Sequence, residues 1–161
     1  MPLFQRVTDL ALGADALRAR RYGVIETRGG GFQSVALRPW PHLLSWREVW
    51  PVGDGWRPQG PSDRCLLYYN QPRGHEKFLA LRYVECTEGT SYKTFRAALE
   101  VLDAIAELKQ ADALLCDASN HRLSDRFLRR MGWAPHAPGW RRRNYIRRFY
   151  GEYPGALARL C

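Results

Sequence analysis

The sequence lacks long apolar runs and closely spaced cysteine pairs. No apolar run reaches the ~18 residues that a membrane-spanning helix needs. Residues 1–20 mix acids and arginines into their apolar positions, which is unlike a secretory signal peptide. The cysteines form no Cys-x-x-Cys pair and the histidines are scattered, so the spacing of a zinc site is missing. We therefore expect a cytoplasmic protein with no bound metal and no membrane partner.

Lysine is scarce, and acidic residues are nearly absent from the last quarter of the chain. There are 3 lysines against 22 arginines, and residues 121–161 hold 10 arginines beside Asp125 and Glu152 alone. Most of the formal net charge of +9 therefore lies in this segment. Guanidinium groups suit two-pronged contact with phosphate or carboxylate. The segment is typical of an ordinary solvated surface, and an anion-binding face is the alternative interpretation.

What the chain contains is typical of one globular domain over residues 1–161. Its 161 residues are 45% hydrophobic and 25% charged, which excludes wholesale disorder and gives enough chain to bury a core. Cys86 and Cys116 lie in apolar, strand-like runs. Disulfides are not expected without a secretory signal, so we interpret both cysteines as buried free thiols.

The first half of the chain predicts a helix followed by strands. Apolar spacing favours a helix over 9–21, and alternation favours strands over 22–28 and 32–38 around a glycine turn. Segment 39–64 has five prolines and four tryptophans, which exclude a long helix. We interpret this segment as a cover over one face of the sheet. A protein interface or the wall of a substrate cleft are the alternatives.

The second half predicts strands and helices in alternation. Strands are expected at 65–70, 77–86, 111–119 and 141–150, with helices at 90–110 and 121–131. The strand over 77–86 is nearly continuous in apolar character, as for a central strand covered on both faces. The helix at 90–110 should connect two parallel strands. The sequence therefore predicts an α/β fold with a mixed central sheet and flanking helices.

The order of these elements resembles the GNAT acyltransferase superfamily. The best local match is SDRFLRRMGW at 124–133, which is similar to the family's helix closed by glycine and an aromatic residue, and the likeness extends over about 78–150. The resemblance implies a GNAT-like fold and an acyltransferase that uses acetyl-CoA or another acyl-CoA. Its acceptor would be a small-molecule or protein amine.

The resemblance also implies site residues. Glu85, at the end of the central strand, would be the general base, acting through a water. Leu128 stands where many family members have a tyrosine acid, so Tyr145 in the last strand is the substitute candidate, with Tyr150 as the alternative. The glycine-rich phosphate loop of the family is reduced here to one glycine. The residues expected to bind the cofactor are Val84, Cys86, Gly89, Thr90, Ser91, Lys93 and Asn120.

The reduced loop leaves a second interpretation open. A GNAT-like fold without catalysis could bind an anionic partner, such as a nucleic acid, through its arginine-rich end, with Trp140 and Tyr145 as stacking platforms. The predicted contact residues are Arg141, Arg142, Arg143, Arg147 and Arg148.

Overall fold

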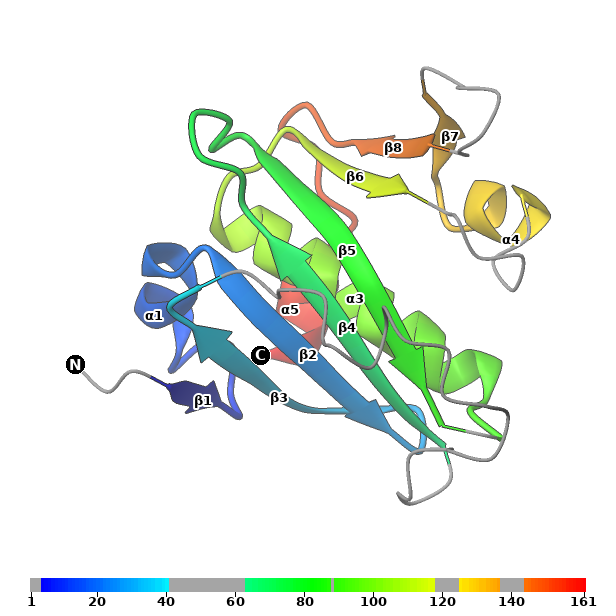
Figure 1. Cartoon of the computed structure of the whole chain (residues 1–161), viewed down its shortest axis with the longest axis horizontal. Coiled ribbons are helices and arrows are strands. Elements are labelled where there is room, and N and C mark those ends of the chain that lie inside the picture. Colours follow the sequence, from blue (N-terminus) through cyan, green and yellow to red (C-terminus); the bar gives the residue numbers. More distant parts are fainter. Residues whose placement is uncertain (1–3, 41–62, 88, 118–124, 137–143) are drawn as a thin grey trace, which may run out of the picture.

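The computed structural model describes residues 4–40, 63–87, 89–117, 125–136 and 144–161. Its centre is a twisted mixed sheet whose eight described strands lie in the order β1-β3-β2-β4-β5-β6-β8-β7 (Figure 1). The strands are β1 (Gln5–Val7), β2 (Tyr22–Arg28), β3 (Gly31–Arg38), β4 (Arg64–Asn70), β5 (Phe78–Cys86), β6 (Ala113–Asp117), β7 (Ala134–Pro135) and β8 (Asn144–Arg148). Neighbouring strands are antiparallel except β5 and β6, which are parallel.

Helices cover one face of this sheet. They are α1 (Ala14–Ala19), α3 (Tyr92–Leu108), α4 (Asp125–Arg130) and α5 (Ala156–Leu160). The long helix α3 packs on β2, β3 and β4, and α1 and α5 pack against it on the same side of the sheet (Figure 1). The core lies between α3 and the sheet, where Ile25, Leu67 and Leu102 are fully buried.

The strands form where the sequence alternates in polarity. In β4, Cys65, Leu67 and Tyr69 are buried toward α3, and the residues between them are half-buried on the opposite face. The glycine turn joins β2 to β3 as expected, and α3 connects the parallel strands β5 and β6. The predicted mixed α/β architecture with flanking helices is thus confirmed.

Two local expectations are wrong. The first helix begins at Ala14 rather than residue 9, because the Asp9 side chain accepts from the Leu12 amide and its carbonyl accepts from Gly13, which closes a separate turn. Strand β5 is not covered on both faces. Its first half alternates between half-buried and buried residues, whereas Arg82 and Tyr83 are exposed.

Several predicted features lie outside the described residues. They are nearly all of the Trp/Pro-rich segment 39–64, Asn120, Trp140 and Arg141–Arg143. No helix within the described part is long and apolar enough to cross a membrane.

Candidate functional site

The parallel strands β5 and β6 separate at a bulge. They pair over four residues each, ending at Leu81 and Cys116, and no described strand pairs with that edge of β5 beyond Leu81. On the other edge, Tyr68 and Tyr69 of β4 lie opposite Tyr83 and Leu81, so Arg82 is an extra residue in β5. A bulge bends its strand and increases the local twist. β5 and β6 diverge from this point, as Figure 1 shows.

The backbone of Val84 points toward the edge that β6 leaves. The Thr87 amide donates to the Arg64 carbonyl at 3.0 Å, which marks Arg64 and Thr87 as a hydrogen-bonded pair. Antiparallel pairs alternate, so Cys65–Cys86 and Leu67–Val84 are non-hydrogen-bonded pairs. In such pairs the N–H and C=O groups point away from the partner strand. Val84 therefore presents one donor and one acceptor along the edge of β5.

Glu85 lies on the sheet face opposite α3. It pairs with Leu66, whose neighbours Cys65 and Leu67 face the core, so Glu85 and Leu66 share the other face. The Glu85 side chain is half-buried and makes no hydrogen bond or ion pair with a described residue. Its carboxylate therefore has acceptor capacity available for a ligand or a water.

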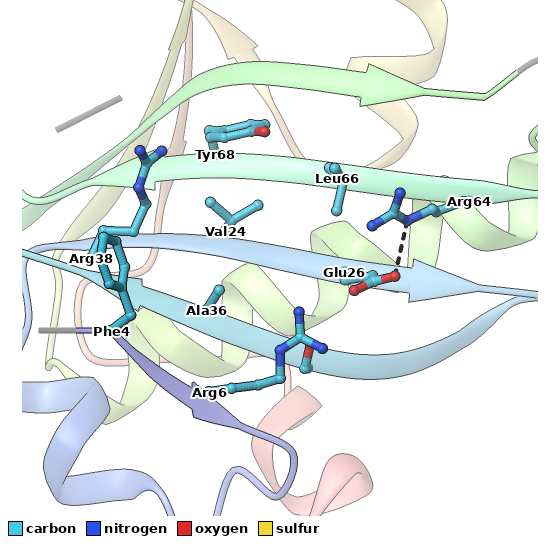
Figure 2. Close-up of a pocket in the computed structure, with 10 residues that line it drawn as sticks. Phe4, Arg6, Val24, Glu26, Ala36, Arg38, Arg64, Leu66 and Tyr68 are labelled. Atoms are coloured by element: carbon cyan, nitrogen blue, oxygen red, sulfur yellow. Dashed lines mark hydrogen bonds and ion pairs between the residues drawn. The ribbon is translucent and has the colours of Figure 1, made fainter. Parts of the chain in front are cut away.

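A pocket of about 260 Å³ lies on this same face (Figure 2). Phe4 and Tyr68 supply aromatic surface, and Leu66 and Val24 supply apolar surface. Arginines approach from three strands, namely Arg6 from β1, Arg38 from β3 and Arg64 from β4. Because Leu66 lines the pocket and pairs with Glu85, the register puts Glu85 beside it.

Glu26 is the acidic residue of the pocket, and two arginines neutralise it. Its Oε1 accepts from Arg64 Nε at 2.9 Å and lies 2.7 Å from the Arg28 guanidinium. Burial opposes ionisation of Glu26, but the hydrogen bonds and charges of Arg64 and Arg28 outweigh it and hold the pKa of Glu26 below its usual value. Three arginines against one carboxylate leave the lining with a net positive charge.

The N-terminus of α3 is already occupied by a carboxylate. Asp63 Oδ1 accepts from the Ser91 amide at 2.7 Å and from the Thr94 hydroxyl at 2.6 Å, and these hydrogen bonds lower the pKa of Asp63. The Ser91 hydroxyl caps the helix by accepting from the Thr94 amide. The Thr90 hydroxyl donates to the Arg64 and Thr87 carbonyls. The side chains of Thr90 and Ser91 thus have internal partners.

Other groups at this helix end have capacity for a ligand. The amides of Tyr92 and Lys93 donate to no described residue, as the first turn of a helix requires. Gly89 has a φ of +82°, and a Cβ there would meet nothing within 4 Å. The stem of Lys93 lies against Gly30 in the β2–β3 turn, where an added Cβ would come within 2.6 Å of it.

Tyr145 and Glu85 lie on opposite faces of the sheet. Tyr145 shares its face with Arg147, which is paired with Asp103 of α3, and its hydroxyl donates to Asp125 at 2.9 Å. The side chain is 3% exposed. The structure therefore does not bring this predicted acid together with the predicted base.

Arg147 departs from its predicted role as a phosphate contact. Its side chain is 16% exposed, lies 3.3 Å from the Asp103 carboxylate and stacks over Phe149. Arg148, on the other face of β8, is exposed. Of the predicted arginine contact set, Arg148 is therefore the described member that presents its side chain to solvent.

Several residues of this site were not predicted from the sequence. Nothing in the sequence marks Asp63 as a site residue, because it reaches the start of α3 only through the folding of the chain around it. Arg6, Arg38 and Arg64 come together through strand order, which spacing along the chain does not encode. A weak signal did exist for Glu26, an acid at a position of β2 that alternation places on the polar face.

No family model matches the chain, and no curated protein is similar to it in sequence. Among solved structures, the chain is similar to a crystal structure of nourseothricin acetyltransferase, with a TM-score of 0.39 and 15% sequence identity over 91% of this chain and 99% of the other. A likeness of this extent assigns no activity.

Proposed function

We propose that this chain transfers an acyl group from an acyl-CoA to an amine. The observation that carries the proposal is the bulge at Arg82, where β5 and β6 part and the backbone edge at Val84 is left without a described partner strand. An extended molecule that carries amides can pair with such an edge as an added strand does. The pantetheine arm of coenzyme A has this chemistry.

The phosphates of the donor would lie where β5 leads into α3. The amides of Tyr92 and Lys93 and the Lys93 ammonium are suited to phosphate, and Gly89 leaves the backbone accessible. Asp63 occupies the same helix end with negative charge, so Lys93 has to offset that carboxylate. The Lys93 charge is therefore the group on which donor affinity should depend most.

Glu85 would act on the acceptor. When bound, acyl-CoA supplies an activated acyl group, and the protein must position a neutral amine beside it. The Glu85 carboxylate, with acceptor capacity available, takes a proton from the acceptor ammonium directly or through a water. We assign no proton donor, because the Tyr145 hydroxyl is held by Asp125 on the opposite face.

The pocket beside Glu85 would hold the acceptor. Its aromatic and apolar surface is combined with three arginines and one neutralised carboxylate. This lining fits an amine that also carries a carboxylate or phosphate group. Arg6 makes no hydrogen bond or ion pair with a described residue, so its guanidinium is the one best able to receive that anion.

Calorimetry with CoA and acetyl-CoA tests the donor site. The Lys93→Ala variant should bind at least about tenfold more weakly, corresponding to the loss of one charge-assisted contact. Lys77→Ala is the matched control, because Lys77 is an exposed lysine at the other end of β5. Absence of CoA binding by the unmodified protein, or an equal loss in both variants, would contradict the proposal.

The rate of acyl transfer to a panel of amines tests the chemistry. Glu85→Gln should lower kcat about a hundredfold or more with CoA affinity retained, in the range of general base catalysis. Glu100→Gln, an acid on the surface of α3, should leave kcat unchanged. Arg6→Gln should raise KM for amines that carry a carboxylate and leave KM for neutral amines as it is.

A further inference from the structure

Two thiols face each other across β4 and β5. Cys65 and Cys86 are direct partners in the strand register, and their sulfur atoms lie 3.6 Å apart. Neither cysteine forms a disulfide in the structure. Cys86 was predicted to be buried; it is half-buried, and its neighbour Cys65 was not foreseen.

The strand geometry suits a bond between them. Because Arg64 and Thr87 form a hydrogen-bonded pair, Cys65–Cys86 is a non-hydrogen-bonded pair. Opposed residues in such pairs have Cα atoms about 4.5 Å apart, and their side chains approach closely. Disulfides span Cα separations of roughly 4.4–6.8 Å. A disulfide can therefore form with small rotations of the two side chains and no shift of strand register.

The two thiols differ in access to solvent. Cys65 is fully buried against the core, and Cys86 is half-buried near the end of β5. The neighbouring Cys86 thiol and burial both raise the pKa of Cys65. Because Cys86 is the more exposed of the two, an oxidant reaches Cys86 first, and Cys65 is the resolving thiol.

We infer that Cys65 and Cys86 form a redox-active pair that closes to a reversible disulfide. With a peroxide as oxidant, the Cys86 thiolate attacks one oxygen and becomes a sulfenic acid, and hydroxide leaves. The Cys65 sulfur then attacks the sulfenic sulfur, its proton goes to the departing hydroxide, and water is released. Two thiols lose two electrons and two protons, and one hydrogen peroxide becomes two waters.

The disulfide would fix the end of β5 to β4. It joins residues on either side of the β4–β5 turn, so it closes a loop of about twenty residues and removes entropy from the unfolded chain. The oxidised protein should unfold at a temperature roughly 5–10 °C higher than the reduced protein. This inference stands on the thiol geometry and does not require the proposed acyltransferase activity.

Peptide mapping tests the bond directly. The Cys161→Ser variant serves as the starting protein, because Cys161 is exposed and would form links between molecules. After brief treatment with hydrogen peroxide, trypsin cuts at Arg73, Lys77 and Arg82 between the two cysteines. The expected product is peptide 65–73 linked to peptide 83–93, and dithiothreitol should release both.

Two variants and a redox buffer complete the test. Cys86→Ser and Cys65→Ala should each abolish the linked peptide and the rise in unfolding temperature. If Cys65→Ala fails to fold, Cys86→Ser alone carries the comparison. Graded ratios of reduced and oxidised glutathione should give a reversible transition in the fraction of linked peptide. Free thiols at both positions after oxidation, or a link through Cys116 instead, would overturn the inference.

Discussion

At the scale of single residues, Gly23 and Tyr69 fit closely across two strands of the core. They are direct partners between β2 and β4, and a Cβ on Gly23 would lie 2.6–2.7 Å from the Tyr69 ring and hydroxyl. Tyr69 is 2% exposed, so other core groups surround its ring. Gly23→Ala should therefore lower the free energy of unfolding by about 2–3 kcal/mol through overpacking.

A double-mutant cycle separates this steric cause from a loss of backbone flexibility. In a Tyr69→Leu background the ring is gone, so Gly23→Ala should cost less than about 1 kcal/mol. Gly31→Ala in the same hairpin is the control, because an added Cβ there meets nothing closer than the Arg28 carbonyl at 3.7 Å. Chemical denaturation of the four proteins of the cycle and of Gly31→Ala gives the energies. Additive effects would refute the steric explanation.

The buried Asp103 should make the stability of the protein depend on pH. It is buried in α3, and burial raises its pKa to about 7, although Arg147 and Arg159 oppose the shift and Glu100 adds to it. The folded protein therefore holds a proton between pH 4 and pH 7 that the unfolded chain has lost. In this range the Asp103 contribution makes stability fall as pH rises.

The isosteric variant Asp103→Asn should remove this dependence. Asn keeps an oxygen for the Arg147 guanidinium, which lies 3.3 Å from the carboxylate. From pH 4 to pH 7, the stability of the variant relative to the native protein should rise by about 2–4 kcal/mol. Other titrating groups cancel in the difference. A difference in the free energy of unfolding between the two proteins that stays constant across this range would show that Asp103 is ionised throughout in the folded state.

At the scale of elements, Thr94 ties the start of α3 to two distant strands. Its fully buried hydroxyl donates to Asp63 before β4 and accepts from the Gly30 amide in the β2–β3 turn at 2.8 Å. The isosteric Thr94→Val variant leaves both groups without this partner, so the free energy of unfolding should fall by about 2–4 kcal/mol. Thr8→Val, at an exposed threonine, should cost under about 0.5 kcal/mol in the same denaturation experiment.

The elements themselves were largely predictable from sequence, because their patterns are local. The glycine turn between β2 and β3 and the apolar spacing of α3 correspond to the observed elements. The predicted start of the first helix at residue 9 was wrong because Asp9 closes a separate turn with its side chain. The spacing of apolar residues does not reveal such a hydrogen bond. The expectation for β5 failed because apolar character does not show whether both faces of a strand are covered, and Arg82 and Tyr83 are exposed.

Most features of the candidate site were not predictable in this way. The bulge at Arg82 is defined against Tyr68 and Tyr69 of another strand, and the Cys65–Cys86 contact depends on the same register. Register is set by long-range packing, which a single sequence does not encode as a local pattern. The predicted roles of Val84, Glu85 and Lys93 stay predictions, since they depend on ligands.

At the scale of the whole molecule, the sheet has two parts joined by a short seam. The β1-β3-β2-β4-β5 part and the β6-β8-β7 part meet through the four residue pairs from Phe78–Ala113 to Leu81–Cys116 (Figure 1). The divergence beyond this seam makes the Val84 edge. An activity that uses this edge therefore depends on how both parts of the sheet are held, and α3 contributes by packing on β2–β4 and pairing with β8 through Asp103 and Arg147.

Hydrogen exchange read by NMR tests whether this edge is available. In the free protein the Val84 amide, which points away from β4, should exchange at least about a hundredfold faster than the amide of Leu67, which lies in a strand paired on both sides. Saturating CoA should slow Val84 if the pantetheine arm pairs with it, and should leave Leu67 unchanged. A Val84 amide that is already slow without CoA would mean that the edge is covered within the protein itself, and the donor would then have to bind elsewhere.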